Sequence, residues 1–142
     1  MKEFEEFIKS NIVKKQSPNK SMAKDLLEES DRKYKSLQSI LNKIGLSDEN
    51  ANDIIEYCYD ILISLIRSKL YLEGFKSSNH EAEISYLVKI GFSETDARTL
   101  DELRQFRNKI KYYGKKFKKD YAEKILNFLE KNQKKLKELL IF

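Results

Sequence analysis

The chain has 142 residues and a mass of 16.9 kDa, a length that predicts a single domain. Its 4 glycines and 1 proline are too few for the many turns of a β-sandwich or β-barrel. A single cysteine and a single histidine exclude an internal disulfide and a cysteine- or histidine-rich metal site, and no glycine-rich phosphate loop occurs. We therefore expect neither a metal nor a cofactor.

Positive charge is concentrated at the C-terminal end of the chain. Residues 104–142 hold 13 Lys/Arg against 4 Asp/Glu, and the stretch 104–119 has eight basic residues and no acidic one. Such a patch indicates nucleic acid, nucleotide or an acidic protein surface as partner, although a solvated lysine-rich helix face explains the charge equally well. No apolar run approaches the roughly 20 residues of a membrane span. We expect a cytoplasmic protein without a membrane partner.

The first predicted element is a short amphipathic helix at the N-terminus. It ends near Lys14, and its apolar positions are Phe4, Phe7, Ile8 and Val13. The segment 16–18, Gln-Ser-Pro, then interrupts the helical pattern. We expect residues 1–16 to form a helical appendage to a domain made by residues 17–142.

Helices are predicted almost throughout the rest of the chain. The apolar spacing predicts them over about residues 18–43, 47–73, 78–91, 93–114 and 118–140. The second of these carries two adjacent apolar rows, a width typical of a central helix that neighbours contact on several sides. Because the loops are short, consecutive helices should be antiparallel neighbours. The sequence therefore predicts an all-α fold, an up-and-down antiparallel bundle of four to five helices.

The helix over residues 100–114 carries the candidate site. Its core-facing positions are Leu103, Phe106, Ile110 and Tyr113. On the opposite side, Arg104, Asn108 and Tyr112 form one row, Arg107 and Lys111 form a second row beside it, and Lys115 follows in the basic stretch. Arginine can grip phosphate with two parallel hydrogen bonds, asparagine can donate to an oxyanion, and tyrosine can stack on a base. These six side chains are the candidate RNA- or nucleotide-binding residues.

The same helix resembles a known family. The string Leu103-Arg-Gln-Phe-Arg-Asn-Lys-Ile-Lys-Tyr-Tyr-Gly114 is similar to the signature helix of HEPN domains, named for higher eukaryotes and prokaryotes nucleotide-binding. The family motif is an arginine, usually followed by a polar residue, with a histidine a few positions further on; Arg107 and Asn108 match its start. The segment 70–81, with a glycine turn and a Ser-x-His before a short helix, also resembles prokaryotic members.

The resemblance implies a helical bundle that commonly forms a homodimer. Many members are metal-independent ribonucleases, often toxins of toxin–antitoxin systems, whereas others act with a small nucleotidyltransferase or are not catalytic. This sequence has no histidine at the motif positions from Tyr112 to Gly114. Tyrosine, with an ordinary pKa of about 10, is a poor general base at pH 7. The resemblance assigns Arg107, Asn108 and Tyr112 as candidate catalytic residues and leaves enzymatic activity open.

Three functions follow from these observations. The first is a HEPN-like RNA- or nucleotide-associated protein that binds phosphate, in a toxin–antitoxin or nucleotidyltransferase-coupled system. The second is a metal-independent ribonuclease in which Arg107 acts with Tyr112 or His80. The third is a non-catalytic protein–protein interaction module, because arginine and tyrosine are enriched at interface hot spots.

Three other side chains bear on these alternatives. His80 stands at a predicted helix start, where local packing or capping explains it more readily than a reach to Arg107. Glu56 and Asp60 lie one turn apart on the central helix. They either pair with Arg104 or Arg107 and orient it, or form a narrow solvent-facing strip.

Overall fold

The computed structural model describes all 142 residues and confirms the all-α bundle. Six helices and one small two-stranded sheet follow the chain in the order α1 (Phe4–Lys9), β1 (Val13–Lys15), α2 (Lys20–Lys43), α3 (Ala51–Leu72), β2 (Phe75–Ser77), α4 (His80–Lys89), α5 (Glu94–Tyr113) and α6 (Lys119–Glu138). No helix combines the length and the apolar character that crossing a bilayer requires.

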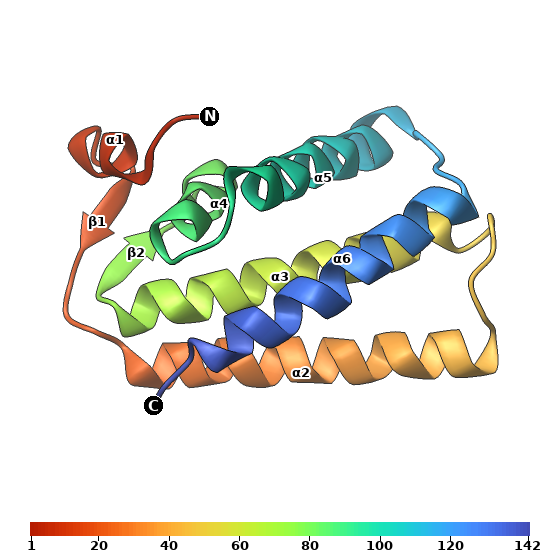
Figure 1. Ribbon diagram of the computed structural model, residues 1–142, viewed down its shortest axis with the longest axis horizontal. Helices are drawn as coiled ribbons and strands as arrows, with labels where there is room; N and C mark the ends of the chain where they lie inside the picture. The colour runs from red at the N-terminus through yellow and green to blue at the C-terminus, as the bar shows by residue number, and fades with distance from the viewer.

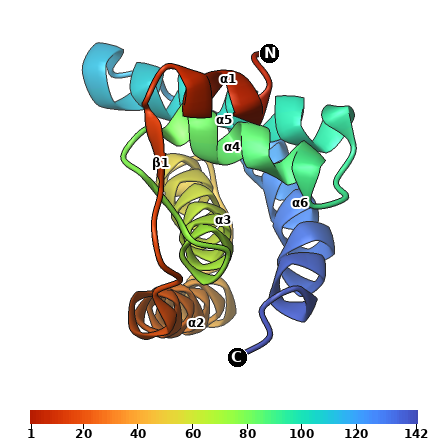
Figure 2. The same cartoon turned by 90° about the vertical axis from the view of Figure 1, so that its left-hand side faces the viewer.

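Helix α3 is the centre of the molecule, as its wide apolar surface predicts. It is packed against α2 on one side, α6 on another, and α4 and α5 on a third (Figures 1 and 2). Two serines permit the close approach of α2, because the Ser30 hydroxyl donates to the Ile61 carbonyl (3.2 Å) and the Ser68 hydroxyl to the Ala23 carbonyl (2.7 Å). These buried polar groups are thus satisfied within the helix pair.

Helix ends follow the polar and glycine signals of the sequence, with two changes of residue. Ser93 caps α5 and Gly114 ends it with a φ of 65°, as expected. Helix α4 is capped by Asn79, whose side chain accepts from the Ala82 amide, and not by Ser78. Asp48 lies within the helix predicted over residues 47–73, but it precedes α3 and accepts the Lys119 amide at 2.8 Å, so it caps the distant helix α6.

The N-terminal segment is part of the bundle core, which corrects the expectation of an appendage. Its helix ends at Lys9 rather than near Lys14, because Val13–Lys15 pairs antiparallel with β2 in the register Val13↔Ser77. Phe4 and Phe7 are buried, and the Phe4 ring lies 4.7 Å from that of Tyr86 on α4. Burying one phenylalanine contributes about 1.5–3 kcal/mol, so this segment is fixed in place.

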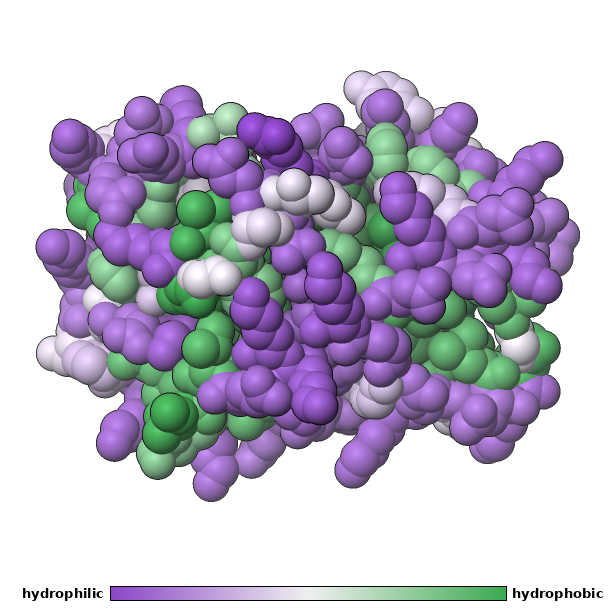
Figure 3. All heavy atoms as spheres, in the orientation of Figure 1, coloured by the Kyte–Doolittle hydropathy of each residue, from purple (hydrophilic) through white to green (hydrophobic).

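The two halves of α5 differ in how they are covered. Its buried residues are Ala97, Leu100 and Leu103, all in the first half. Figure 1 shows α5 along one side of the molecule, with its C-terminal end continuing into the loop to α6. Tyr113, expected to face the core, is 83% exposed because no other element covers the end of this helix. The face seen in Figure 3 is mostly hydrophilic, as the charged composition requires.

Candidate functional site

Arg107 lies where α3, α4 and α5 meet, with 27% of its side chain exposed. One terminal nitrogen, Nη2, is 3.5 Å from Oδ1 of Asp60, and the guanidinium carbon lies 5.4 Å from the centre of the Tyr59 ring. Its Nε is buried and has no hydrogen-bond partner. An arginine held by a carboxylate and an aromatic face, with a donor still unused, is oriented before any ligand arrives.

Asp60 is the carboxylate that orients Arg107, which was one of the two hypotheses for the acidic pair on α3. Its other oxygen is 3.4 Å from the Lys33 amine on α2, so it connects three helices. Glu56, one turn earlier, has no ion-pair or hydrogen-bond partner and lines an open groove between α2 and α3 with Arg32, Lys33 and Tyr57. The two acids therefore have different environments despite their spacing.

His80 is connected to Arg107 through Tyr59, which contacts both residues. It is the first residue of α4, and its Nδ1 lies 2.8 Å from the hydroxyl of Tyr59, the residue whose ring faces Arg107. The Tyr59 side chain is fully buried and has no other hydrogen-bond partner. If the hydroxyl accepted from Nδ1, its own hydrogen would be buried without an acceptor, which costs about 1–3 kcal/mol.

We therefore assign the Tyr59 hydroxyl as the donor and Nδ1 of His80 as the acceptor. The hydrogen of the neutral imidazole then sits on Nε2. Nε2 has no protein partner and is not among the buried unpaired atoms, so it is open to solvent. His80 thus presents an N–H group outward, beside the guanidinium of Arg107.

The surroundings keep both His80 and Tyr59 uncharged at neutral pH. Burial lowers the pKa of His80 below its ordinary value of 6.5, and the positive charges of Arg67 and Arg107 lower it further, against a smaller opposing effect of Asp60. Burial raises the pKa of the Tyr59 hydroxyl far above its ordinary value of 10. The pair is therefore a neutral phenol and a neutral imidazole.

Two more arginines, Arg67 on α3 and Arg104 on α5, influence the pKa values of His80 and Tyr59. Arg104 donates to Asp101, one turn earlier on α5, at 2.9 Å. Arg67 on α3 donates from Nε to the buried carboxylate of Glu83 on α4, at 2.5 and 3.2 Å to its two oxygens. Both arginines are among the charges that lower the pKa of His80. Burial raises the pKa of Glu83 to about 7, although Arg67 opposes this shift.

The structure divides the six candidate binding residues into two groups. Arg104 and Arg107 are half-buried and belong to the cluster around Tyr59 and His80. The other four, which no hydrogen bond or ion pair connects to that cluster, are exposed: Asn108, Lys111, Tyr112 and Lys115. Tyr112 is 69% exposed, with only the Lys111 amine near its ring at 6.0 Å. The Asn52 side chain donates to the Lys115 carbonyl at 2.9 Å, which holds the basic loop to α3.

Sequence reasoning missed Tyr59, Arg67 and Glu83. Tyr59 and Arg67 are two turns apart on α3, and their positions in the helical pattern gave neither of them a functional role. One signal was available: Glu83 lies between Ala82 and Ile84 in a short helix, and an acid on an apolar helix face is costly unless paired. Its partner is 16 residues away, and the sequence alone cannot identify it.

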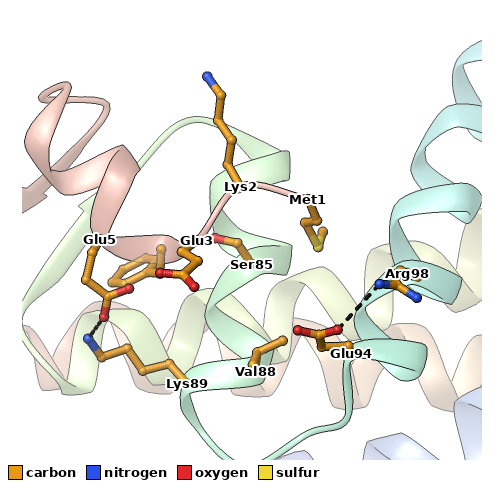
Figure 4. Close-up of a pocket in the computed structure, with 10 residues that line it drawn as sticks. Met1, Lys2, Glu3, Glu5, Ser85, Val88, Lys89, Glu94 and Arg98 are labelled. Atoms are coloured by element: carbon orange, nitrogen blue, oxygen red, sulfur yellow. Dashed lines mark hydrogen bonds and ion pairs between the residues drawn. The ribbon is translucent and has the colours of Figure 1, made fainter.

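A separate pocket lies away from the cluster around Tyr59. About 330 Å³ lie between the N-terminal segment, the end of α4 and the start of α5 (Figure 4). Its charged side chains are mostly paired with one another, Glu5 with Lys89 and Glu94 with Arg98. None of the candidate site residues lines it.

Comparisons with known protein families, curated proteins and solved structures find no match for this chain.

Proposed function

We propose that this chain is a HEPN-like protein that binds the phosphate groups of RNA or of a nucleotide at Arg107, His80 and Arg104. The observation that carries the proposal is the arrangement around Tyr59: the guanidinium of Arg107 lies over its ring, and its hydroxyl fixes His80 with Nε2–H facing solvent. We place the protein in a toxin–antitoxin or nucleotidyltransferase-coupled system on the strength of the sequence resemblance.

The cluster supplies hydrogen-bond donors rather than a large net charge. Each arginine has a carboxylate partner, with Asp60 for Arg107 and Asp101 for Arg104. The pairing fixes each guanidinium, so less side-chain freedom is lost when a phosphate binds. Longer-range attraction comes from the exposed lysines that follow on α5 and in the loop 114–118. Asn108, Lys111, Tyr112 and Lys115 would then contact a longer ligand beyond the phosphate held by Arg107.

A metal-independent ribonuclease is the second candidate, and the connection between His80 and Arg107 through Tyr59 favours it. Cleavage would require a base to take a proton from the RNA 2′-hydroxyl. His80 with its hydrogen on Nε2 is a neutral donor toward the ligand, so it is suited to binding a phosphate oxygen and not to accepting this proton. The Tyr112 hydroxyl has no basic group bonded to it that would activate it as a replacement. We therefore rank binding above cleavage.

The test is RNA binding by Arg107→Ala beside a matched arginine variant. Arg98 is on the same helix but nine residues earlier, which places it on the opposite face, and it is exposed. Charge-assisted hydrogen bonds are worth about 1.5–3 kcal/mol, so Arg107→Ala should bind a labelled single-stranded oligoribonucleotide at least roughly tenfold more weakly, and Arg98→Ala nearly as wild type. Thermal unfolding of both variants is the control for folding.

Two outcomes would contradict the proposal. If both variants weaken binding equally and only at low salt, the protein has a charged face and no site. If Arg107→Ala loses stability and binds as wild type, the arginine is structural, and an interaction module becomes the better account. RNA cleavage by the wild type in EDTA, abolished by His80→Ala, would instead establish the ribonuclease.

A further inference from the structure

The Arg67–Glu83 pair is the most deeply buried ion pair of the molecule and has no part in the function proposed above. The Glu83 side chain has no exposed surface, whereas 32% of the Arg67 side chain is exposed. Arg67 thus extends from a buried carboxylate toward solvent. A buried charge is costly, and replacing such a pair by apolar residues is often neutral or stabilising. Stability alone therefore does not account for Glu83.

The geometry of the pair fixes the direction of the guanidinium. Both contacts to the carboxylate come from Nε of Arg67, at 2.5 and 3.2 Å. The two terminal nitrogens, Nη1 and Nη2, make no hydrogen bond to the protein and are not among its buried unpaired atoms. An arginine held at Nε keeps its terminal fork for another acceptor, and that fork suits the oxygens of a phosphate.

The free fork lies near His80, because Glu83, which holds Arg67, is three residues after His80 on α4 and so about one turn along the same face. Arg67 is the largest charge effect on His80, followed by Arg107, so both guanidinium groups act on the same imidazole ring. Arg67 also acts on Tyr59, the residue between His80 and Arg107. Two arginines from different helices therefore influence His80: Arg67, held by Glu83 one turn further along α4, and Arg107, which lies over the Tyr59 ring.

We propose that Arg67 is a second anion-binding residue of the site and that Glu83 is a positioning residue that holds it there. The inference rests on the proposed function and adds a residue that the sequence pattern of α5 does not contain. The ligand is a phosphate ester that Arg67 and Arg107 both contact.

The pair also links anion binding to a proton. Arg67 from α3 is the only charged group that acts on the Glu83 carboxylate. The neutral Tyr59 also interacts with it, and His80 lies one turn earlier on the same helix. A phosphate that binds Arg67 weakens the attraction between Arg67 and the Glu83 carboxylate, which raises the pKa of Glu83 further. Glu83 therefore takes up a proton when the anion binds. Because the pKa of Glu83 is about 7, affinity should rise as pH falls from 8 to 6.5. His80 contributes charge only at lower pH, since its pKa is below 6.5.

The experiment measures binding of a labelled single-stranded oligoribonucleotide by four full-length variants between pH 6.5 and 8. Arg67→Ala should bind roughly tenfold more weakly than the wild type. Arg67→Lys should bind with intermediate affinity, because lysine keeps the positive charge but lacks both the Nε–H that Glu83 accepts and the two terminal nitrogens that contact phosphate. Glu83→Gln keeps an acceptor for Nε without the titrating group, so it should bind with a flat pH profile. Arg98→Ala is the arginine control.

The outcomes separate this inference from the proposed function. If Arg67→Lys and Arg67→Ala bind as wild type while Arg107→Ala is weakened, Arg67 is only the structural partner of Glu83 and the inference is wrong, but the function stands. If Glu83→Gln keeps the pH profile of the wild type, the positioning and proton-linked role of Glu83 is wrong. If neither Arg67 nor Arg107 variants change binding, the proposed function itself fails.

Discussion

At the scale of single residues, the environment of each charged group matters more than its type. Asp60 and Glu56 are one turn apart on α3, yet only Asp60 contacts Arg107. Cys58 on the same helix is fully buried in the core, and burial raises the pKa of its thiol to about 12, so it is not an activated thiolate. His80 and Tyr59 are neutral because burial opposes their charged forms. Chemistry at this site therefore depends on neutral donors and fixed guanidinium groups.

The tautomer of His80 is a first prediction at this scale. Tyr59→Phe keeps the ring under Arg107 and removes only the hydroxyl that donates to Nδ1. In the wild type, ¹⁵N NMR of the imidazole should show the Nε2–H form, and in Tyr59→Phe a mixture of tautomers. The free energy of unfolding should fall by about 1 kcal/mol for the lost hydrogen bond. An Nδ1–H form in the wild type would overturn the assignment and restore His80 as a candidate base.

The pH dependence of stability is a second prediction at this scale. The pKa of Glu83 is raised from 4.5 to about 7 in the folded chain, so the folded state holds a proton that the unfolded state releases. This contribution is fully present below pH 4.5 and is lost as pH rises through 7. It amounts to on the order of 3 kcal/mol.

Urea unfolding should therefore show a loss of stability between pH 5 and 8 that is absent in Glu83→Gln. His80 works in the other direction: its pKa is lowered in the folded chain, so its contribution is present above pH 6.5 and is lost as pH falls from there through the lowered pKa. A His80→Gln variant separates the two effects. Equal pH dependence in the wild type and Glu83→Gln would contradict the assignment of this loss to Glu83.

At the scale of elements, the contact of the N-terminal segment with the β2 turn depends on one glycine. Gly74 has a φ of +81°, and a Cβ there would lie 2.5 Å from the carbonyl oxygen of Gln16. That carbonyl belongs to the chain between β1 and α2, and the Gln16 amide donates to the Gly74 carbonyl at 2.8 Å. The glycine thus permits both the turn after α3 and the close approach of the N-terminal chain.

Gly74→Ala should consequently destabilise the protein more than Gly91→Ala does. Both glycines have positive φ, but a Cβ at Gly91 would meet nothing within 4 Å, so the difference isolates the clash with Gln16. The backbone strain common to both variants is about 1–3 kcal/mol, and the clash adds to it in Gly74→Ala. Urea denaturation of the two variants measures the difference, and equal losses would show that the N-terminal chain simply moves away.

At the scale of the whole molecule, the second half of α5 is incompletely covered by the other helices. This half has no buried residue, and Phe106 and Ile110 there are only half-buried. Phe106 contacts Phe117 and Tyr121 at ring distances of 5.2 and 5.4 Å, which covers one side only. The same half carries the basic residues that begin at Arg104.

We expect a homodimer through this half of α5, in line with the sequence resemblance. A symmetric dimer would bring the two basic faces together, so salt or a bound polyanion should favour it by screening their repulsion. Sedimentation should therefore show a species of twice 16.9 kDa whose population increases with salt or with added oligoribonucleotide. A monomer under all these conditions at high micromolar concentration would contradict the prediction.

The helices, their order and the central position of α3 were all predictable from the amino-acid sequence. These features depend on apolar periodicity and helix caps, which are determined by residues close together in the chain. Ser93 and Gly114 are examples at the two ends of α5. The sequence also identified Arg107 and the two acids of α3 as possible partners. The N-terminal strand escaped prediction because its pairing with β2 joins residues about sixty positions apart.

Only the tertiary structure decided which side chains share a site. Arg107, Tyr59, His80, Arg67 and Glu83 come from three helices, and their contacts span many residues of chain. The solvent exposure of a side chain also depends on tertiary packing. Tyr113 fits the apolar spacing of α5 but lies where no other element covers the helix. Helical periodicity determines the direction in which a side chain points from the axis of its own helix. The residues that it contacts in that direction depend on how the other helices pack.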